Sequence, residues 1–498
     1  MKDSAFDEML EIYEEITRLK QLSDLLMWDQ NTYMPPGSVG SRAAQNSLVT
    51  GLIHQRITSK RMGELLASMK ESELSEQEQA MVREVRRDHE RKSSIPEKLA
   101  REISKTEAEG TQIWVKAKQN NDFASFAPIL GRMIDLKGQV TEHLGYAENP
   151  YDALLEDYEP YMTSREIRSI FGPLRAGLVN MVKKIADSGH EIDSSPIMGS
   201  FPKEGQESLS KRILGDMGYD FERGRLDVTE HPFTVGSMDD TRITTKYNIE
   251  DLRPGIFGSI HEGGHALYEQ GFLEENYCSP LAESVSLGIH ESQSRFWENI
   301  IGRSLPFWEH YLPITGEHFP RLKRYDPVDI YRAVNTVAPS LIRVQADEVT
   351  YNLHILIRFE LETKIFKGEL DVKDIPEAWN ERYEEFLGLR PKTDTTGCLQ
   401  DIHWAVGYFG YFPTYTLGNL YSAQILDGMG RDVADLHSRV KRGEFGEILV
   451  WLRSRIHRHG RMYPAKELIR RATGYELSSD HFLSYVKEKY SGIYGINL

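Results

Sequence analysis

The segment His261-Glu262-Gly263-Gly264-His265 constrains the fold of this 498-residue chain more than any other. If the segment is helical, its two histidines share one face, where both rings can bind a single metal ion. Glu262 then lies beside the metal, and its carboxylate can accept a proton from a water molecule. The segment therefore predicts a helix that carries two metal ligands and a general base.

The residues around this motif favour a helix of suitable length. Pro254 suits a first helical turn, and Gly271 suits a stop after the last one. The two glycines inside the motif each cost about 1 kcal/mol relative to alanine in a helix interior. We therefore expect another helix or a substrate to approach the backbone closely there. The structural alternative is a core helix whose two histidines are hydrogen-bonded within the fold.

A third metal ligand is expected downstream, because a catalytic zinc ion usually has three protein ligands and one position for water. The segment 282–298 has the pattern of a helix and follows a break at Ser279-Pro280. Glu283 and Glu291 would share a face of such a helix, so spacing does not choose between them. One could be the ligand and the other its support. The possible donors in this segment are Glu283, His290, Glu291 and Glu298.

Several further segments complete a resemblance to a known family. They are His231-Pro232-Phe233, Asp240-Thr241-Arg242-Ile243-Thr244-Thr245, His290-Glu291-Ser292-Gln293-Ser294-Arg295, Ile342-Arg343-Val344-Gln345-Ala346-Asp347-Glu348 and Gly397-Cys398-Leu399-Gln400-Asp401-Ile402-His403-Trp404. With the metal motif, they resemble the M32 metallocarboxypeptidases, the carboxypeptidase Taq family, over essentially the whole chain. In that family the glutamate of the His-Glu-Ser-Gln segment is the third metal ligand, and this position is Glu291.

The resemblance implies a fold and an activity. The fold is mainly α and gluzincin-like: a large helical body of two lobes with a deep cleft and a small β-sheet beside the metal site. The activity is the removal of single residues from the C-terminus of peptides, with broad specificity. The implied metal is zinc, with cobalt as the alternative, and the implied assembly is a homodimer.

A carboxypeptidase must recognise the free carboxylate at the end of its substrate. An arginine suits this task because its planar guanidinium matches the two carboxylate oxygens. The arginine of the family's helix motif corresponds to Arg343, which we predict binds the substrate carboxylate. Arg242 and Arg295 are alternatives. Arg295 lies four residues after Glu291 and could instead form an ion pair that holds this ligand in position.

Polar and aromatic side chains are concentrated between Gln400 and Asn419. Peptide hydrolysis needs a hydrogen-bond donor for the oxyanion that develops on the scissile carbonyl, and a tyrosine or an imidazole can supply it. Residues from this region line the cleft in M32 enzymes. The resemblance therefore implies catalytic roles for His403, Tyr411 and Tyr415, and substrate binding by Gln400. For any single tyrosine, the structural alternative is packing in an aromatic turn.

Only one region has a clear β pattern. Residues 233–235 and 242–247 flank a turn-like segment, which predicts a hairpin just ahead of the metal helix. An exposed strand there could pair with an extended peptide substrate through backbone hydrogen bonds. The hairpin could equally brace the helices, and both roles remain open.

Composition narrows the classes of protein that need to be considered. A net charge of −16 and a pI near 5.6 disfavour nucleic-acid binding. The two cysteines, Cys278 and Cys398, form no disulfide framework and suit a reducing compartment. No secretory signal is visible, and no apolar run approaches the length of a membrane span. We therefore expect a cytoplasmic protein that binds neither nucleic acid nor membrane.

Residues 1–498 are expected to form a single, mostly helical peptidase domain, because no linker-like tract interrupts them. The turn-rich stretch 190–206 is a possible lobe boundary. Two alternatives to a carboxypeptidase remain. One is a helical zinc oligopeptidase that cuts peptides internally with the same metal chemistry. The other is a non-catalytic helical binding protein in which H-E-x-x-H occurs by chance.

Overall fold

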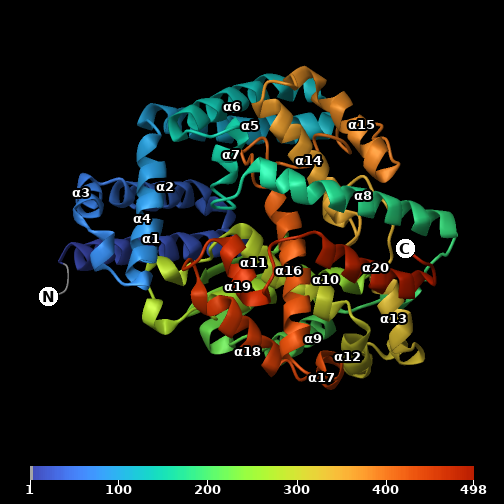
Figure 1. Cartoon of the computed structure of the whole chain (residues 1–498). Coiled ribbons are helices and arrows are strands. Elements are labelled where there is room, and N and C mark those ends of the chain that lie inside the picture. Colours follow the sequence, from blue (N-terminus) through green and yellow to red (C-terminus); the bar gives the residue numbers. More distant parts are fainter. Residues whose placement is uncertain (1–3) are drawn as a thin grey trace.

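The computed structural model describes residues 4–498, apart from the side chains at positions 4 and 71, and most of this part of the chain is helical. In Figure 1, α5, α6, α7, α14 and α15 form an upper group of helices, and α9–α13 with α17–α20 form most of a lower group. The helix α16 runs between the two groups. The predicted mainly α fold with a small β-sheet is confirmed.

The helices have the following bounds. The first ten are α1 (Ser4–Thr32), α2 (Val39–Ile57), α3 (Lys60–Ser68), α4 (Glu76–Ser94), α5 (Glu97–Asn120), α6 (Phe123–Leu144), α7 (Pro150–Leu155), α8 (Ser164–Ser188), α9 (Lys203–Met217) and α10 (Leu252–Glu269). The others are α11 (Leu287–Arg295), α12 (Leu305–His318), α13 (Pro327–Val334), α14 (Tyr351–Phe366), α15 (Ile375–Leu387), α16 (Pro413–Asp432), α17 (Leu436–Arg442), α18 (Gly446–Arg455), α19 (Ala465–Thr473) and α20 (Asp480–Tyr494).

Local sequence signals begin several of these helices. At the start of α4, the Ser75 hydroxyl accepts from the Glu78 backbone N–H while the Glu78 carboxylate accepts from the Ser75 N–H. Thr163 and Glu166 make the same reciprocal pair at the start of α8. Each pair satisfies two backbone donors that a helix start leaves free. The segment 190–206 follows α8, contains one short helical turn, Ser195–Ile197, and extends into the first turn of α9.

The sheet has three strands, in the order β1 (Gly224–Val228), β3 (Asp240–Thr245) and β2 (Thr234–Ser237). β2 and β3 are antiparallel, with Thr234 opposite Ile243 and Ser237 opposite Asp240. The predicted hairpin is therefore confirmed. β1 was not predicted, and it pairs parallel with β3. β2 is left as an edge strand close to α1 and α10.

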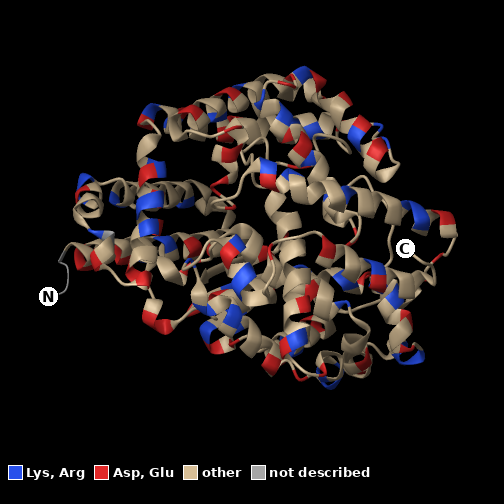
Figure 2. Ribbon diagram, in the orientation of Figure 1, with Lys and Arg blue, Asp and Glu red and all other residues tan. Residues whose placement is uncertain are grey.

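The buried core surrounds the helices that position the metal motif. α14 and α16 are buried along almost their whole length, and α10 packs against the sheet, α9 and α11. The N-terminal helices α1, α3 and α4 share a separate small apolar cluster that includes Met9, Tyr13, Met62 and Val85. Charged residues of both signs are spread over the helices (Figure 2). The described residues contain no helix that is long and apolar enough to cross a bilayer.

Candidate metal centre

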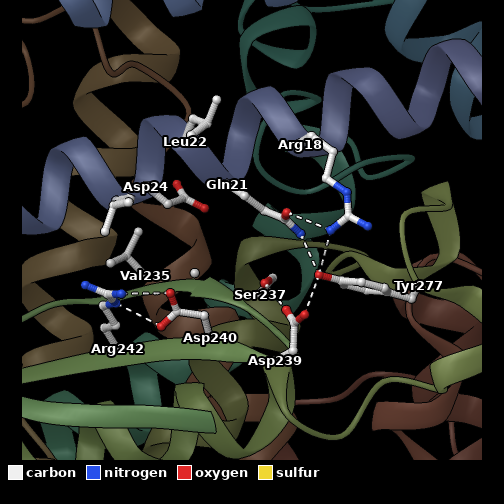
Figure 3. Close-up of a pocket in the computed structure, with 12 residues that line it drawn as sticks. Arg18, Gln21, Leu22, Asp24, Val235, Ser237, Asp239, Asp240, Arg242 and Tyr277 are labelled. Atoms are coloured by element: carbon white, nitrogen blue, oxygen red, sulfur yellow. Dashed lines mark hydrogen bonds and ion pairs between the residues drawn. The ribbon is translucent and has the colours of Figure 1, made fainter.

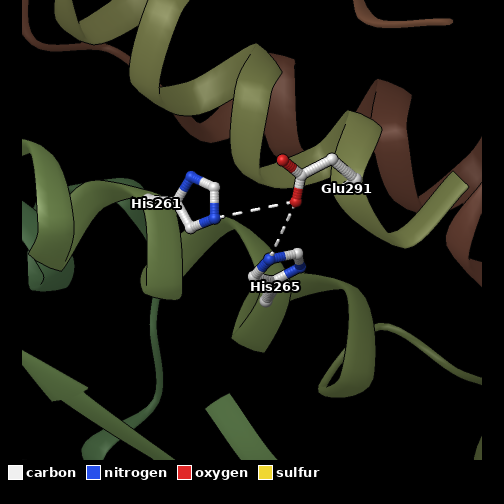
Figure 4. Close-up of side chains that lie close together, drawn as sticks. All are labelled: His261, His265 and Glu291. Atoms are coloured by element: carbon white, nitrogen blue, oxygen red, sulfur yellow. Dashed lines mark ion pairs between the residues drawn. The ribbon is translucent and has the colours of Figure 1, made fainter. Parts of the chain in front are cut away.

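Three donor side chains from α10 and α11 converge on one point. The side chain of Asp251 caps α10, and His261 and His265 follow one turn apart on one face of that helix. Glu291 of α11 faces both rings, as Figure 4 shows. Its Oε2 lies 3.7 Å from His261 Nε2 and 3.5 Å from His265 Nε2. These two nitrogens and the carboxylate oxygen all lie within 4.8 Å of one another.

This arrangement suits a divalent transition metal. Ligands about 2.0–2.2 Å from a tetrahedral zinc ion lie about 3.3–3.6 Å apart, close to the two His–Glu separations here. Two imidazoles and one carboxylate are also the donor set of catalytic zinc sites that keep a position for water. The residues therefore fit the expected metal, and small adjustments of their side chains would complete the coordination.

The two glycines of the motif allow the close approach that the sequence predicts. A Cβ atom at Gly264 would lie 2.6 Å from the backbone of Gln293 and Ser294 on α11. On the other side of α11, a Cβ atom at Gly418 of α16 would lie 2.5 Å from Glu291 Cγ. Glu291 is thus held between two helices that come within backbone contact of α11.

The start of α11 is fixed by a buried carboxylate from the loop before α8. The two oxygens of Glu159 accept hydrogen bonds from the Gly288 N–H at 3.1 Å and the Tyr421 hydroxyl at 2.7 Å. The backbone oxygen of Tyr158 accepts from the Leu287 N–H. Burial raises the pKa of Glu159 to about 7, although its hydrogen-bond donors oppose this. The loop therefore determines where α11 begins.

Glu298 orients the first metal-binding histidine. His261 Nδ1 donates to Glu298 Oε2 across 2.9 Å, which leaves Nε2 free for the metal. Glu298 is also paired with Arg295 at 3.3 Å and with Arg303 at 3.0 Å. Burial alone would raise its pKa, but His261 and the two arginines lower it below the usual value. Glu298 was among the possible metal donors in the sequence. In the structure it instead contacts Nδ1 of His261, the ring nitrogen that does not face the other metal ligands.

Glu291 is held charged by a neighbour on its own helix. Arg295 Nε donates to Glu291 Oε1 across 2.6 Å, the ion pair expected from their spacing. Burial opposes ionisation of Glu291, but Arg295 and His261 bring its pKa below the usual range. The other carboxylate oxygen, Oε2, faces the histidines. The ligand is therefore ionised at neutral pH and its orientation is fixed.

His265 is supported by stacking. Its ring lies on the ring of His290, with centroids 4.3 Å apart, and His290 Nε2 lies 2.9 Å from Glu269 Oε1. Burial, together with the nearby His290, lowers the pKa of His265 to about 3 in the metal-free site. The imidazole is then neutral, the form that binds metal.

Glu262 lies beside the metal ligands and is anchored by the edge strand. The Thr234 hydroxyl, at the start of β2, lies 2.6 Å from Glu262 Oε2 and 3.0 Å from the Glu262 carbonyl oxygen. Burial raises the pKa of Glu262, although His261 and Thr234 favour its charged form. A carboxylate with a raised pKa is well suited to accept and return a proton. No pattern in the sequence singled out Thr234 for this contact.

The structure corrects the predicted helix 282–298. Helix α11 begins only at Leu287, and its C-terminal continuation, Phe296–Gly302, is a π-helix. Glu283 has an extended backbone ahead of the helix, so it shares no helical face with Glu291. Its carboxylate contacts Tyr13, Lys20 and Arg461. The Ser286 cap and the Glu159 contact start the helix later than the apolar pattern indicates.

A second polar cluster surrounds Arg343. Asp401 pairs with Arg343 at 2.9 Å and with Arg358 at 2.6 Å. Both arginines are almost fully buried. Two buried guanidiniums therefore share the single carboxylate of Asp401. Arg343 also donates to the Tyr351 hydroxyl at 3.0 Å. The Arg295 guanidinium lies 4.8 Å from the centre of the Tyr351 ring, which connects this cluster to the metal ligands.

The predicted oxyanion donors lie in the same cluster. Tyr415 lies between Tyr351 and Tyr411, with ring centroids 6.0 and 5.4 Å away. The ring of His403 packs on Tyr411 at 5.4 Å. Burial lowers the pKa of His403 to about 4, although Asp401 favours the charged form. This imidazole is therefore neutral at physiological pH.

Gln400 and Arg242 have other surroundings. The Gln400 Oε1 accepts from the Arg343 N–H at 2.9 Å, and its Nε2 donates to backbone oxygens that include that of Leu341. Gln400 thus holds the segment that carries Arg343. Arg242 pairs with Asp240 at 2.8 Å and lies over the ring of Trp28 at 4.2 Å. Arg242 shares none of the Arg343 contacts.

Comparison with known proteins decides the family. Residues 8–490 match the family model described as carboxypeptidase Taq (M32) metallopeptidase. The chain belongs to the M32 family. It is 44% identical to thermostable carboxypeptidase 1 of Thermus thermophilus, over 99% of both chains, and 40% identical to carboxypeptidase 1 of Bacillus subtilis, over 98% of both. The crystal structure of the M32 carboxypeptidase from Deinococcus radiodurans superposes with a TM-score of 0.96 at 39% identity, covering 99% of this chain and 100% of that one.

Membership of M32 makes the protein a metallocarboxypeptidase, as the resemblance of its motifs implied. It also implies a divalent metal ion, and His261, His265 and Glu291 form a donor set suited to one. The M32 relatives are named carboxypeptidases, which gives no support to a non-catalytic binding protein or to an enzyme that cuts internally.

Proposed function

We propose that this M32 enzyme is a zinc-dependent carboxypeptidase that removes single C-terminal residues with broad specificity, and that cobalt can replace zinc. The observation that carries the proposal is the convergence of His261, His265 and Glu291 on one point beside Glu262. A bound divalent ion would polarise the scissile carbonyl and lower the pKa of a water molecule. Glu262 would accept the proton of that water and return it to the leaving amine.

Arg343 is our proposed partner of the substrate carboxylate. Arg343 and Arg358 carry two positive charges against the single negative charge of Asp401, so the buried cluster has an excess of one positive charge. An uncompensated buried charge is unfavourable, and an incoming carboxylate would neutralise it. Gln400 would support this interaction by fixing the backbone of Arg343.

His403, Tyr411 and Tyr415 are the proposed donors to the oxyanion. The three side chains pack on one another, and Glu291 is among the charges that influence both tyrosine hydroxyls. Their neutral N–H and O–H groups can donate a hydrogen bond without bringing further positive charge to the site. Arg242 is the second proposed substrate-binding arginine; it makes two hydrogen bonds to Asp240 and lies apart from the Arg343 cluster.

The proposed function is tested with Glu262→Gln. This variant should keep its metal, because Glu262 is not a ligand, and it should lose about 10²–10⁴-fold in kcat. Metal content by mass spectrometry and turnover of a C-terminally free peptide check both expectations. Near-normal turnover would show that Glu262 is not the base.

Arg343→Ala is the matching test of substrate recognition. It should reduce turnover of free-acid peptides far more than any residual turnover of their C-terminal amides. The products should be shortened one residue at a time from the C-terminus, while a peptide blocked at both ends stays intact. An equal loss on free-acid and amidated substrates would remove Arg343 from carboxylate recognition.

The proposed function extends to the compartment of the protein, its number of subunits and its division into domains. We propose a cytoplasmic homodimer in which residues 1–498 form one peptidase domain, with a lobe boundary near 190–206. The reducing compartment is supported by Cys278 and Cys398, which are both buried and unpaired. The homodimer rests on the family resemblance and is checked by sedimentation equilibrium.

A further inference from the structure

A pocket lies between α1 and the β2–β3 hairpin, next to the proposed catalytic site. The side of α1 from Arg18 to Leu25 forms one wall, and residues Val235–Ser237 of β2 with Asp239, Asp240 and Arg242 form the other. Figure 3 shows Arg18, Gln21 and Asp24 on the side of α1 that faces the hairpin. Tyr277 lies at one end, where its hydroxyl contacts Arg18 at 3.0 Å and Asp239 at 2.6 Å.

Most charged groups of this pocket already have partners. Arg242 makes two hydrogen bonds to Asp240, at 2.8 and 2.9 Å. Arg18 donates to the Tyr277 hydroxyl and to Gln21, and Asp239 accepts from Tyr277 and from Ser237. The remaining charged residue is Asp24. No hydrogen bond or ion pair to Asp24 is found among the described residues.

Lys20 is the cation near Asp24 and favours its charged form, but no hydrogen bond or ion pair joins the two side chains in the described residues. Lys20 is one turn away on α1, but its ammonium is bonded to Glu283 at 2.6 Å. Glu269 and Glu283 add negative charge nearby, and burial with Glu269 raises the pKa of Asp24 to about 7. With two arginines and three aspartates, the pocket has a formal charge of −1, and Asp24 accounts for it. A bound cation would relieve this repulsion.

The edge strand connects this pocket to the catalytic base. Thr234 at the start of β2 bonds Glu262, and Val235, Gly236 and Ser237 line the pocket. The first of these pocket residues, Val235, directly follows Thr234, which holds the base. Because a strand rises about 3.4 Å per residue, the last one, Ser237, lies about 10 Å from Thr234 along the strand. The Arg343 cluster instead approaches the metal ligands through Tyr351 and Arg295. The pocket is thus available to the part of the peptide before the scissile bond.

We propose that this pocket binds a positively charged group of the substrate on the N-terminal side of the scissile bond, with Asp24 as its counterion. The group is a lysine or arginine side chain, or the free α-ammonium of a short peptide. The inference rests on the proposed function and gives it a substrate preference. Leu22 and Leu25, both exposed on the α1 wall, would contact the aliphatic part of a long basic side chain.

The test compares matched N-acetylated hexapeptides that carry lysine or norleucine at the second or third residue before the scissile bond. The wild-type enzyme should favour lysine about tenfold in kcat/KM at one of these positions. Asp24→Asn should bring the lysine-to-norleucine ratio close to one, while Asp24→Glu should retain much of it. A second arm compares tripeptides with free and acetylated N-termini, and so identifies the α-ammonium as the source of the charge.

Two controls keep the test decisive. Glu11→Gln removes an exposed carboxylate from α1 outside the pocket, and it should leave the lysine-to-norleucine ratio as in the wild type. Binding of the same peptides to Glu262→Gln, measured by calorimetry, reports the preference without turnover. If the wild type shows no preference for a positive charge in either arm, or if Asp24→Asn keeps it, the subsite does not exist. If no peptide is cleaved but the binding preference is present, the proposed function fails while the subsite stands.

Discussion

The close approach of α10 and α11 at Gly264 leads to the most quantitative prediction. In Gly264→Ala, the new Cβ atom would meet the Gln293 carbonyl oxygen and the Ser294 Cα atom at 2.6 Å. Ordinary contacts begin at 3.4 Å, so the two helices must separate by about 0.8 Å. Both neighbouring atoms belong to the backbone and cannot rotate away. His265 and Glu291, which lie on the two helices, must move apart with them.

The expected cost follows from two opposing effects. Overpacking against a rigid backbone costs about 3 kcal/mol, the upper end of the usual range. Alanine regains about 1 kcal/mol through its better helix propensity. The metal-free variant should therefore lose about 2 kcal/mol of unfolding free energy. Because a displacement close to 1 Å at a catalytic site costs about 10²-fold, kcat/KM should fall by roughly this factor.

Gly258→Ala provides the matched control on the same helix. Its Cβ atom would lie 3.4 Å from Thr245 Oγ1, an ordinary contact, so only the gain in helix propensity remains. Urea unfolding of the metal-free proteins and peptide turnover of the metal-loaded proteins measure both variants. If Gly264→Ala is as stable and as active as Gly258→Ala, the two helices do not pack as described.

Three further predictions concern the surroundings of the metal. Glu298→Gln should weaken metal binding about 10–100-fold, because the amide holds His261 less well; competition with a chromophoric chelator measures this, and unchanged affinity would contradict it. Removing the metal with a chelator should lower the unfolding free energy by about 2.7 kcal/mol relative to protein with free metal at 100 times its Kd, and equal urea midpoints would argue against a folded-state site. Glu159 has a folded pKa of about 7, above the unfolded value of 4.5, so its protonation stabilises the fold below pH 4.5 and this contribution is lost as the pH rises through 7. Glu159→Gln should therefore lose less stability than the wild type between pH 5 and pH 8, by up to about 3 kcal/mol in urea unfolding, and parallel profiles would refute this.

The parts of the fold with a local signal could be predicted from the sequence. The metal helix was recognisable because its ligands, its start and its stop lie within one stretch, 252–271. The β2–β3 hairpin was recognisable from its alternating pattern and its turn. The first strand, Gly224–Val228, was missed because it is short, begins with glycine and contains Arg225 and Asp227. Its place in the sheet depends on a parallel partner farther along the chain.

The supporting residues of the site had no local signal. Glu298 is one of many helical glutamates until the fold brings it to His261, 37 positions earlier in the chain. Glu159 and Thr234 contact the site from other elements. Glu283 seemed equivalent to Glu291 only if the helix extended to it. In the structure Glu283 instead joins the N-terminal helices through Tyr13 and Lys20.

Anomalous diffraction from crystals of the zinc-loaded protein, measured on both sides of the zinc absorption edge, would locate the metal relative to its three proposed ligands. We expect one strong zinc peak, about 2.0–2.2 Å from Nε2 of His261, Nε2 of His265 and Oε2 of Glu291. A zinc peak that lacks any one of these three ligands, or that lies away from Glu262, would contradict this expectation.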